Sequence, residues 1–216
     1  MDEDLVPPDD LKGLSEKEIE PWRTELDVVS TLVSMGHDVL KVGLRDELAP
    51  LRAAIHSWKP DVAFNLLEEF QGETTYDYLV VSYLESMGVH YTGCNPRGLI
   101  LARDKGLSKK ILAYHRIRTP DFAVFPMGRK VTRPRRLEFP LFVKSLVEEA
   151  SLGISQASVV DSDEKLVERV EFIHNSIKTD AIVEKYIAGR ELYVGVIGNH
   201  RLQVLPVWEL FFANMP

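Results

Sequence analysis

Lys144 stands at the end of a short apolar run and immediately before a small, acidic loop. The run Pro140–Val143 has the composition of a buried strand. The loop Ser145–Gly153 combines small side chains, carboxylates and a glycine. A lysine supplies positive charge, and the backbone N–H groups of such a loop can close over phosphate oxygens, so the arrangement is typical of a phosphate-binding site. A β-hairpin with an ordinary surface lysine fits the same residues, because short motifs often match by chance.

A second stretch further along the chain, Ala181–Gly195, has the sequence AIVEKYIAGRELYVG. Together with FPLFVK and EEASLGIS, in this order, it resembles the ATP-grasp superfamily. Within that superfamily it is most similar to D-alanine–D-alanine ligase and its relatives. The resemblance extends over roughly residues 60 to 210, and its specificity lies in the ordered set of motifs.

The resemblance implies two lysines and a loop that bind the nucleotide phosphates. Lys144 is the implied phosphate lysine, and Lys105, in the pair Asp104-Lys105, is the implied second one. The loop 148–153 folds over the phosphates and excludes water. Lys144 and Ser151 are the implied catalytic residues.

The resemblance also implies where the nucleoside binds. The segment 184–187 holds adenine between two domains, and the acid at Glu191 contacts ribose. The implied nucleotide-binding residues are Lys105, Lys144, Glu148, Ser151, Gly153, Glu184, Lys185, Tyr186, Ile187 and Glu191.

The chain departs from the family pattern at two places. The segment Phe64–Glu73, FNLLEEFQGE, resembles the family's F-N-x-L-H-G-x-x-G-E, but Glu68 and Glu69 stand where the family has His-Gly. An acid in place of an imidazole changes the charge and the titration range of the implied first-substrate site. In the loop, Glu149 and Ala150 stand where the family has glycine and serine. The resemblance therefore implies ligase chemistry without implying D-alanine as the substrate.

The composition is that of a globular protein with one large or two small domains. The chain has 216 residues, of which 45% are hydrophobic and 27% are charged. The formal net charge of −7 argues against a nucleic-acid partner, which would need a basic face. Cys94 is the single cysteine, so no internal disulfide can form. The sequence has no signal peptide or membrane-spanning run, and we expect a cytoplasmic protein with no membrane partner.

Apolar residues at helical spacing alternate with short apolar runs in the first half of the chain. Trp22, Leu26, Val29 and Val33 recur at i, i+4, i+7 and i+11, which predicts one face of a helix that Gly36 ends. An alternation of helices and strands is typical of a parallel sheet covered by helices. The expected elements are helices at 20–35, 48–58, 76–87 and 97–115, and strands at 37–42, 61–65 and 89–93.

We therefore expect an α/β fold of ATP-grasp architecture in three parts. Residues 1–97 form an N-terminal parallel α/β domain on the substrate side, and residues 98–182 form the central α+β ATP-binding subdomain. Residues 183–216 begin the third subdomain and leave it incomplete. Family members begin with a strand that we do not find here, and the resemblance places the Mg²⁺ ligands beyond residue 216. We accordingly expect no metal ligands in this chain and expect it to be a piece of a longer protein.

The resemblance implies an ATP-dependent ligase that joins a carboxylate to an amine. An amino-acid carboxylate attacks the γ-phosphate of ATP, and the amine of a second substrate then displaces phosphate from the acylphosphate. The implied cofactors are ATP and Mg²⁺, the implied partners are small amino acids, and a homodimer is allowed. Two alternatives stay open: a nucleotide-binding module without catalysis, and a ligase that adds amino acids to a peptide or protein.

Overall fold

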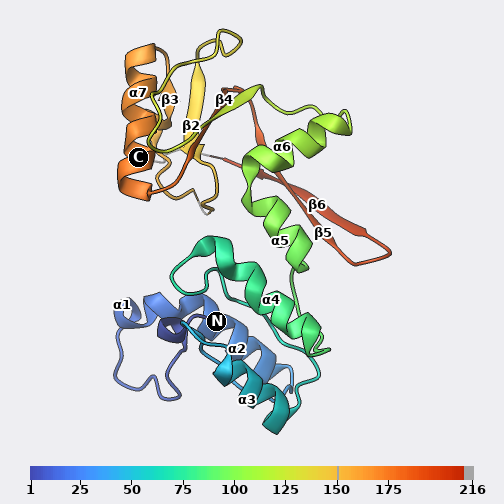
Figure 1. Cartoon of the computed structure of the whole chain (residues 1–216). Helices are drawn as coiled ribbons and strands as arrows, with labels where there is room; N and C mark the ends of the chain where they lie inside the picture. Colours follow the sequence, from blue (N-terminus) through green and yellow to red (C-terminus); the bar gives the residue numbers. More distant parts are fainter. Residues whose placement is uncertain (150, 212–216) are drawn as a thin grey trace.

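The computed structural model describes residues 1–149 and 151–211. Helices α1 to α4 form one part of the molecule, and a sheet with helices α6 and α7 forms another, with α5 leading between them (Figure 1). The helices are α1 (Glu16–Ile19), α2 (Arg23–Ser34), α3 (Ala49–Trp58), α4 (Asp77–Ser86), α5 (Pro96–Arg103), α6 (Lys105–Tyr114) and α7 (Asp163–Phe172). The strands are β1 (Phe122–Phe125), β2 (Leu141–Ser145), β3 (Val159–Val160), β4 (Ala181–Lys185), β5 (Glu191–Ile197) and β6 (Gln203–Leu210).

A four-stranded antiparallel sheet forms the centre of the second part. Its strand order is β1-β4-β2-β3, so β4 lies between β1 and β2. Within β2, Leu141, Val143 and Ser145 are buried, whereas Phe142 and Lys144 are less buried and point to the opposite face. This alternation follows from the two-residue period of a strand. One face of the sheet is therefore apolar, and the other carries Lys144.

Helix α7 covers the apolar face of this sheet. Leu166, Val170 and Ile173 recur at helical spacing at the end of α7 and in the turn that follows it. They join Leu141 and Val143 of β2 in one buried apolar cluster. This packing fixes the orientation of β2, because a one-residue slip would move its apolar side chains to the other face.

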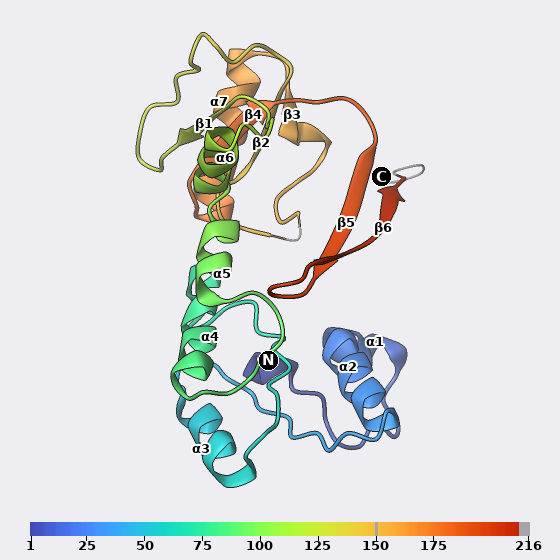
Figure 2. The same ribbon diagram turned by 90° about the vertical axis from the view of Figure 1, so that its right-hand side faces the viewer.

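Strands β5 and β6 form a separate antiparallel hairpin that extends from the second part of the molecule (Figure 2). Its register pairs Glu191 with Leu210 and Ile197 with Gln203. The turn between the strands contains Gly198 at φ +117°, and a Cβ at this position would collide with the carbonyl oxygen of Arg201. Glycine is therefore required for this tight connection.

The three strands predicted in residues 37–93 are not regular strands in the structure. Isolated parallel bridges join Ala63 to Tyr91 and Asp2 to Leu44. The parallel direction is therefore the one predicted, but among the described residues of this part the pairing does not extend into a ladder.

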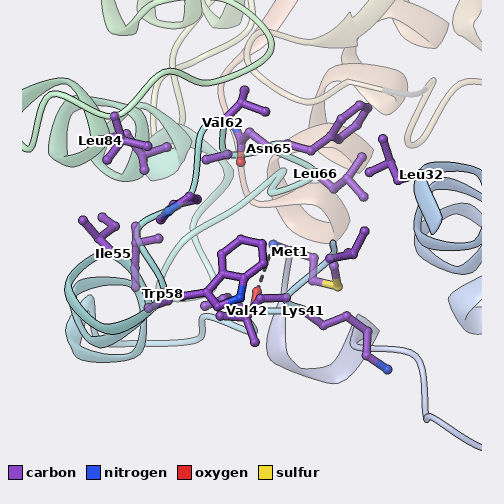
Figure 3. Close-up of a pocket in the computed structure, with 18 of the residues that line it drawn as sticks. Met1, Leu32, Lys41, Val42, Ile55, Trp58, Val62, Asn65, Leu66 and Leu84 are labelled. Atoms are coloured by element: carbon purple, nitrogen blue, oxygen red, sulfur yellow. Dashed lines mark hydrogen bonds between the residues drawn. The ribbon is translucent and has the colours of Figure 1, made fainter. Parts of the chain in front are cut away.

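A cavity of about 620 Å³ is lined by residues of the first and second predicted strands (Figure 3). Its lining includes Val42 from the first predicted strand, Val62 and Asn65 from the second, and Ile55 and Trp58 from α3. The predicted strands 37–42 and 61–65 lie on different sides of this space, so the backbone groups of these two segments do not meet at the spacing that a ladder requires.

The single helix predicted at 97–115 is two helices, α5 and α6, that meet at Asp104. Asp104 is extended, with φ −85° and ψ 97°, and its carboxylate accepts a hydrogen bond of 2.8 Å from the N–H of Leu107. Aspartate favours this N-cap position over a helix interior, because its side chain can satisfy a backbone N–H that has no partner in the helix. The break places Lys105 in the first turn of α6.

Replacement of Leu141 by alanine should destabilise the fold far more than a matched change on the surface. Leu141 is 0% exposed in the core, whereas Leu202, at the end of the hairpin turn, is 66% exposed. We expect Leu141→Ala to lower the free energy of unfolding by about 2–5 kcal/mol and Leu202→Ala by less than about 0.5 kcal/mol. Urea denaturation of both variants measures the difference, and equal losses would contradict this account of the core.

Candidate nucleotide-binding site

The carboxylate of Glu184, on β4, lies between two lysines. Lys144 of β2 places its Nζ 2.5 Å from Oε1 of Glu184, and Lys109 of α6 places its Nζ 2.7 Å from Oε2. The side chain of Glu184 is only 10% exposed. Oε2 receives no directed hydrogen bond within the described residues, so Lys109 holds it as an ion pair.

The two lysines keep this buried carboxylate ionised. Burial by itself raises the pKa of Glu184, because a low-dielectric environment disfavours the charged form. The close contacts with Lys109 and Lys144 and the positive charges of these lysines outweigh burial, and the net result is a lowered pKa. Glu184 therefore remains an anion at neutral pH and neutralises part of the lysine charge.

Lys105 extends from the first turn of α6 toward the loop that follows β2. Its Nζ donates to the carbonyl oxygen of Glu148 at 2.5 Å and to that of Leu146 at 3.4 Å. Burial lowers the pKa of Lys105, and the positive charge of Lys144 lowers it further. The structure thus brings the two predicted phosphate lysines close enough to interact electrostatically.

Three ammonium groups gather beside the end of β2 and the first turns of α6. Lys109 and Lys144 contact Glu184, whereas Lys105 interacts electrostatically with Lys144 and with the carboxylates of Glu149 and Glu148. Several ammonium groups in one partly buried place can bind an anionic ligand with several oxygens, which a polyphosphate supplies. The residues present therefore fit a nucleotide phosphate chain.

The loop predicted to fold over the phosphates is tethered at both ends. At its start, the hydroxyl of Thr74 donates to Oε1 of Glu148 at 3.0 Å. At its end, the guanidinium of Arg169 donates to the carbonyl oxygen of Gly153. Gly153 has φ +71°, and a Cβ there would lie 2.9 Å from the side chain of Ile177, so glycine is needed.

Ser151 is an exposed residue between these two tethers. Its φ is +61°, a conformation that few residues other than glycine adopt, and its carbonyl oxygen accepts a hydrogen bond from Ile154. The neighbouring Ala150, where the family has serine, lies outside the described residues.

The predicted adenine segment continues directly from β4. The N–H of Lys185 donates to the carbonyl oxygen of Asp121 at 2.9 Å, and the N–H of Tyr186 donates to that of Pro140 at 3.0 Å. The ring of Tyr186 stacks near that of Phe142, with centroids 6.5 Å apart. Tyr186 is 39% exposed and Ile187 is 64% exposed. The segment therefore presents apolar surface next to Glu184, as a site for a flat aromatic base would.

Glu191 lies on β5 and is exposed. Its carboxylate accepts a hydrogen bond of 2.9 Å from the hydroxyl of Tyr193, and this bond raises the pKa of Tyr193. Glu191 is thus at the start of the hairpin. Its role toward ribose stays a prediction.

Two groups at this site were not predicted from the sequence. Lys109 follows Lys105 by four residues on a helix, a spacing that puts both side chains on one face and could have been recognised. Arg103 forms a buried ion pair of 2.5 Å with Asp77 of α4, and its guanidinium also lies 3.7 Å from Glu149 in the loop. No local pattern marks that pair, because its members belong to different helices.

Residues 1–149 and 151–211 contain no group of three or more His, Cys, Asp or Glu side chains arranged to hold a metal ion. In the same ranges, no helix is both long enough and apolar enough to cross a membrane.

Comparisons with known proteins point to one family. A family model described as the C-terminus of D-ala D-ala ligase matches residues 105–214, just over half of the chain. An uncharacterised protein of Sinorhizobium fredii is 34% identical over 201 residues, which cover 88% of this chain and 57% of that protein. A D-alanine–D-alanine ligase of Syntrophotalea carbinolica is 33% identical over 199 residues, which cover 90% of this chain and 60% of that ligase.

A solved structure shows the same architecture. The crystal structure of D-alanine–D-alanine ligase from Bacillus anthracis complexed with ATP superposes with a TM-score of 0.70 at 25% identity. The match covers 94% of this chain and 65% of that ligase. The fold is thus that of the ATP-grasp class, as predicted. The chain belongs to the D-alanine–D-alanine ligase family, and it spans less than two thirds of the length of the curated relatives described above.

Replacement of Glu184 by glutamine should remove a pH-dependent part of the stability. The pKa of Glu184 is lowered from its ordinary value of 4.5, so the unfolded chain takes up this proton at a higher pH than the folded protein does. Glu184 therefore adds stability above pH 4.5 that is lost as the pH falls through its folded-state pKa.

Urea denaturation between about pH 6 and about pH 3 measures this contribution. The unfolding free energy of the wild type, minus that of Glu184→Gln, should decrease as the pH falls. The exposed Glu171 provides a control, because Glu171→Gln should follow the wild-type profile. Parallel profiles for wild type and Glu184→Gln would show that the carboxylate is not held as described.

Proposed function

We propose that the site around Glu184 binds ATP. The observation that carries the proposal is the pairing of Lys109 and Lys144 with one buried carboxylate, with Lys105 close to Lys144 and an exposed apolar segment beside them. A nucleotide needs both features, since its phosphates require positive charge and its base requires an apolar surface. The ATP-bound ligase of Bacillus anthracis, which shares this fold, supports the proposal.

In this proposal each predicted residue has a defined task. Lys105 and Lys144 neutralise phosphate charge, and the loop 148–153, with Ser151, covers the phosphates. The segment 184–187 holds adenine, and Glu191 binds ribose. The loop would exclude water from the reacting groups, which protects an acylphosphate from hydrolysis.

We further propose that the whole protein is an ATP-dependent carboxylate–amine ligase. The carboxylate of an amino acid attacks the γ-phosphorus of ATP, and ADP leaves. The amine of a second substrate then attacks the acyl carbon, loses a proton and releases phosphate, so that an amide bond forms. Relatives named D-alanine–D-alanine ligase support this reaction class. Phosphoryl transfer of this kind depends on positioning and on neutralisation of charge, and the lysines supply part of both.

Several parts of the proposal rest on the family alone. Mg²⁺ belongs to it as a charge-neutralising cofactor. Small amino acids are the proposed substrates, with Glu68 and Glu69 at the first-substrate site as a departure that leaves D-alanine unassigned. The division into residues 1–97, 98–182 and 183–216, a homodimer and a cytoplasmic location also stay predictions.

The proposed reaction predicts release of ADP that depends on an amino acid. The whole protein that contains this chain, supplied with ATP and Mg²⁺, should release ADP with at least one member of a panel of D- and L-amino acids. A coupled assay for ADP measures the rate. Lys144→Ala should reduce that rate at least about 100-fold, because phosphate charge stabilisation is lost.

Lys130→Ala is the matched control, because Lys130 lies exposed in a loop and should leave the rate unchanged. If no amino acid elicits ADP release from the wild type, the ligase reaction is wrong, and a nucleotide-binding module without catalysis becomes the better account.

A further inference from the structure

Lys144 has two competing partners in the proposed cycle. In the structure its Nζ is paired with Glu184 at 2.5 Å, yet the proposed function requires it to bind phosphate. The ammonium group has three N–H donors but a single positive charge, so a phosphate that binds it competes with the carboxylate for that charge and weakens their pairing. Glu184 would then lose one of its two counter-charges while remaining only 10% exposed.

We propose that Lys109 is a positioning residue that holds Glu184 ionised and in place while Lys144 transfers to the nucleotide phosphates. This inference rests on the proposed ATP site and deepens it. Lys109 acts through Glu184 and Lys144, and no contact between Lys109 and the nucleotide is required.

The surroundings of the two lysines differ in the way this division of tasks needs. Both ammonium groups lie over an aromatic ring, that of Lys109 5.6 Å from the centroid of Phe122 and that of Lys144 5.8 Å from the centroid of Phe142, so exposure is what distinguishes the two lysines. The side chain of Lys109 is 12% exposed. The side chain of Lys144 is 23% exposed, about twice as much. Lys109 is therefore the better-fixed partner, and Lys144 has the freer path to a ligand.

The electrostatic consequence follows from burial. A buried carboxylate that loses all its partners is strongly disfavoured, and removal of one member of a buried ion pair is costly for the same reason. With Lys109 present, Glu184 keeps a counter-ion when Lys144 leaves. Without Lys109, Lys144 is the sole counter-ion of Glu184, so its transfer to phosphate is opposed.

Titration with a non-hydrolysable ATP analogue tests this inference on the chain as it stands. Lys109→Met should raise the dissociation constant at least about tenfold, because the buried charge then retains Lys144. Lys109→Arg, which keeps the positive charge, should recover most of the affinity. Lys110→Met is the matched control: it makes the same change on the next residue of α6, which is exposed, and should leave the dissociation constant unchanged.

A second-site change separates this role from a merely structural one. In the Glu184→Gln background there is no buried charge to compensate, so Lys109→Met should no longer weaken binding. The double variant Lys109→Met/Glu184→Gln should therefore bind the analogue more tightly than Lys109→Met alone and about as tightly as Glu184→Gln alone. If Lys109→Met by itself fails to fold, the comparison of the double variant with Glu184→Gln alone remains decisive.

Each outcome has a distinct meaning. If the wild type does not bind the analogue, the proposed ATP site itself is wrong. If the wild type binds but Lys109→Met behaves like Lys110→Met, the ATP site stands and the role of Lys109 is wrong. Equal weakening by Lys109→Met in the presence and absence of Glu184 would also overturn it, because the effect would then not pass through that carboxylate.

Discussion

The need to keep one buried carboxylate paired governs the arrangement of this site. Glu184 is ionised because Lys144 and Lys109 face it from a strand and from a helix. This pairing can form only if β2 and β4 are in register and α6 lies beside them. The apolar cluster between the sheet and α7 secures the register, and the cap at Asp104 sets the start of α6. Core packing and helix capping thus determine where the charges meet.

Contacts of the loop after β2 and of α5 link the two parts of the molecule. Lys105 reaches from α6 to the backbone of the loop after β2, and Thr74, from the N-terminal part, donates to Glu148 in that loop. The buried pair of Arg103 and Asp77 joins α5 to α4 close by. The start of the loop is therefore held by side chains from both parts of the molecule.

Local patterns predicted much of this structure, and contacts between distant segments account for what they did not predict. The strand with Lys144, the loop to Gly153 and the segment from Glu184 each follow from short-range composition and from the resemblance. The predicted parallel ladder is reduced to isolated bridges, and a cavity lies beside the first and second predicted strands, which no local pattern records. The helix break at Asp104 was recognisable as an N-cap, but helix periodicity on both sides concealed it. The position of Lys109 against Glu184 depends on how α6 packs on the sheet, and periodicity gives only its helix face.

The central claim is that Lys144, released from Glu184, binds the phosphates of ATP. The most direct test measures the thermodynamic stability of the chain with and without a non-hydrolysable ATP analogue and Mg²⁺. At a ligand concentration of about 100 times the dissociation constant, the wild type should gain roughly 2.7 kcal/mol. Lys144→Ala should lose most of this gain at the same ligand concentration, whereas Lys130→Ala should keep it. An equal gain in wild type and Lys144→Ala, or no gain in the wild type, would contradict the account.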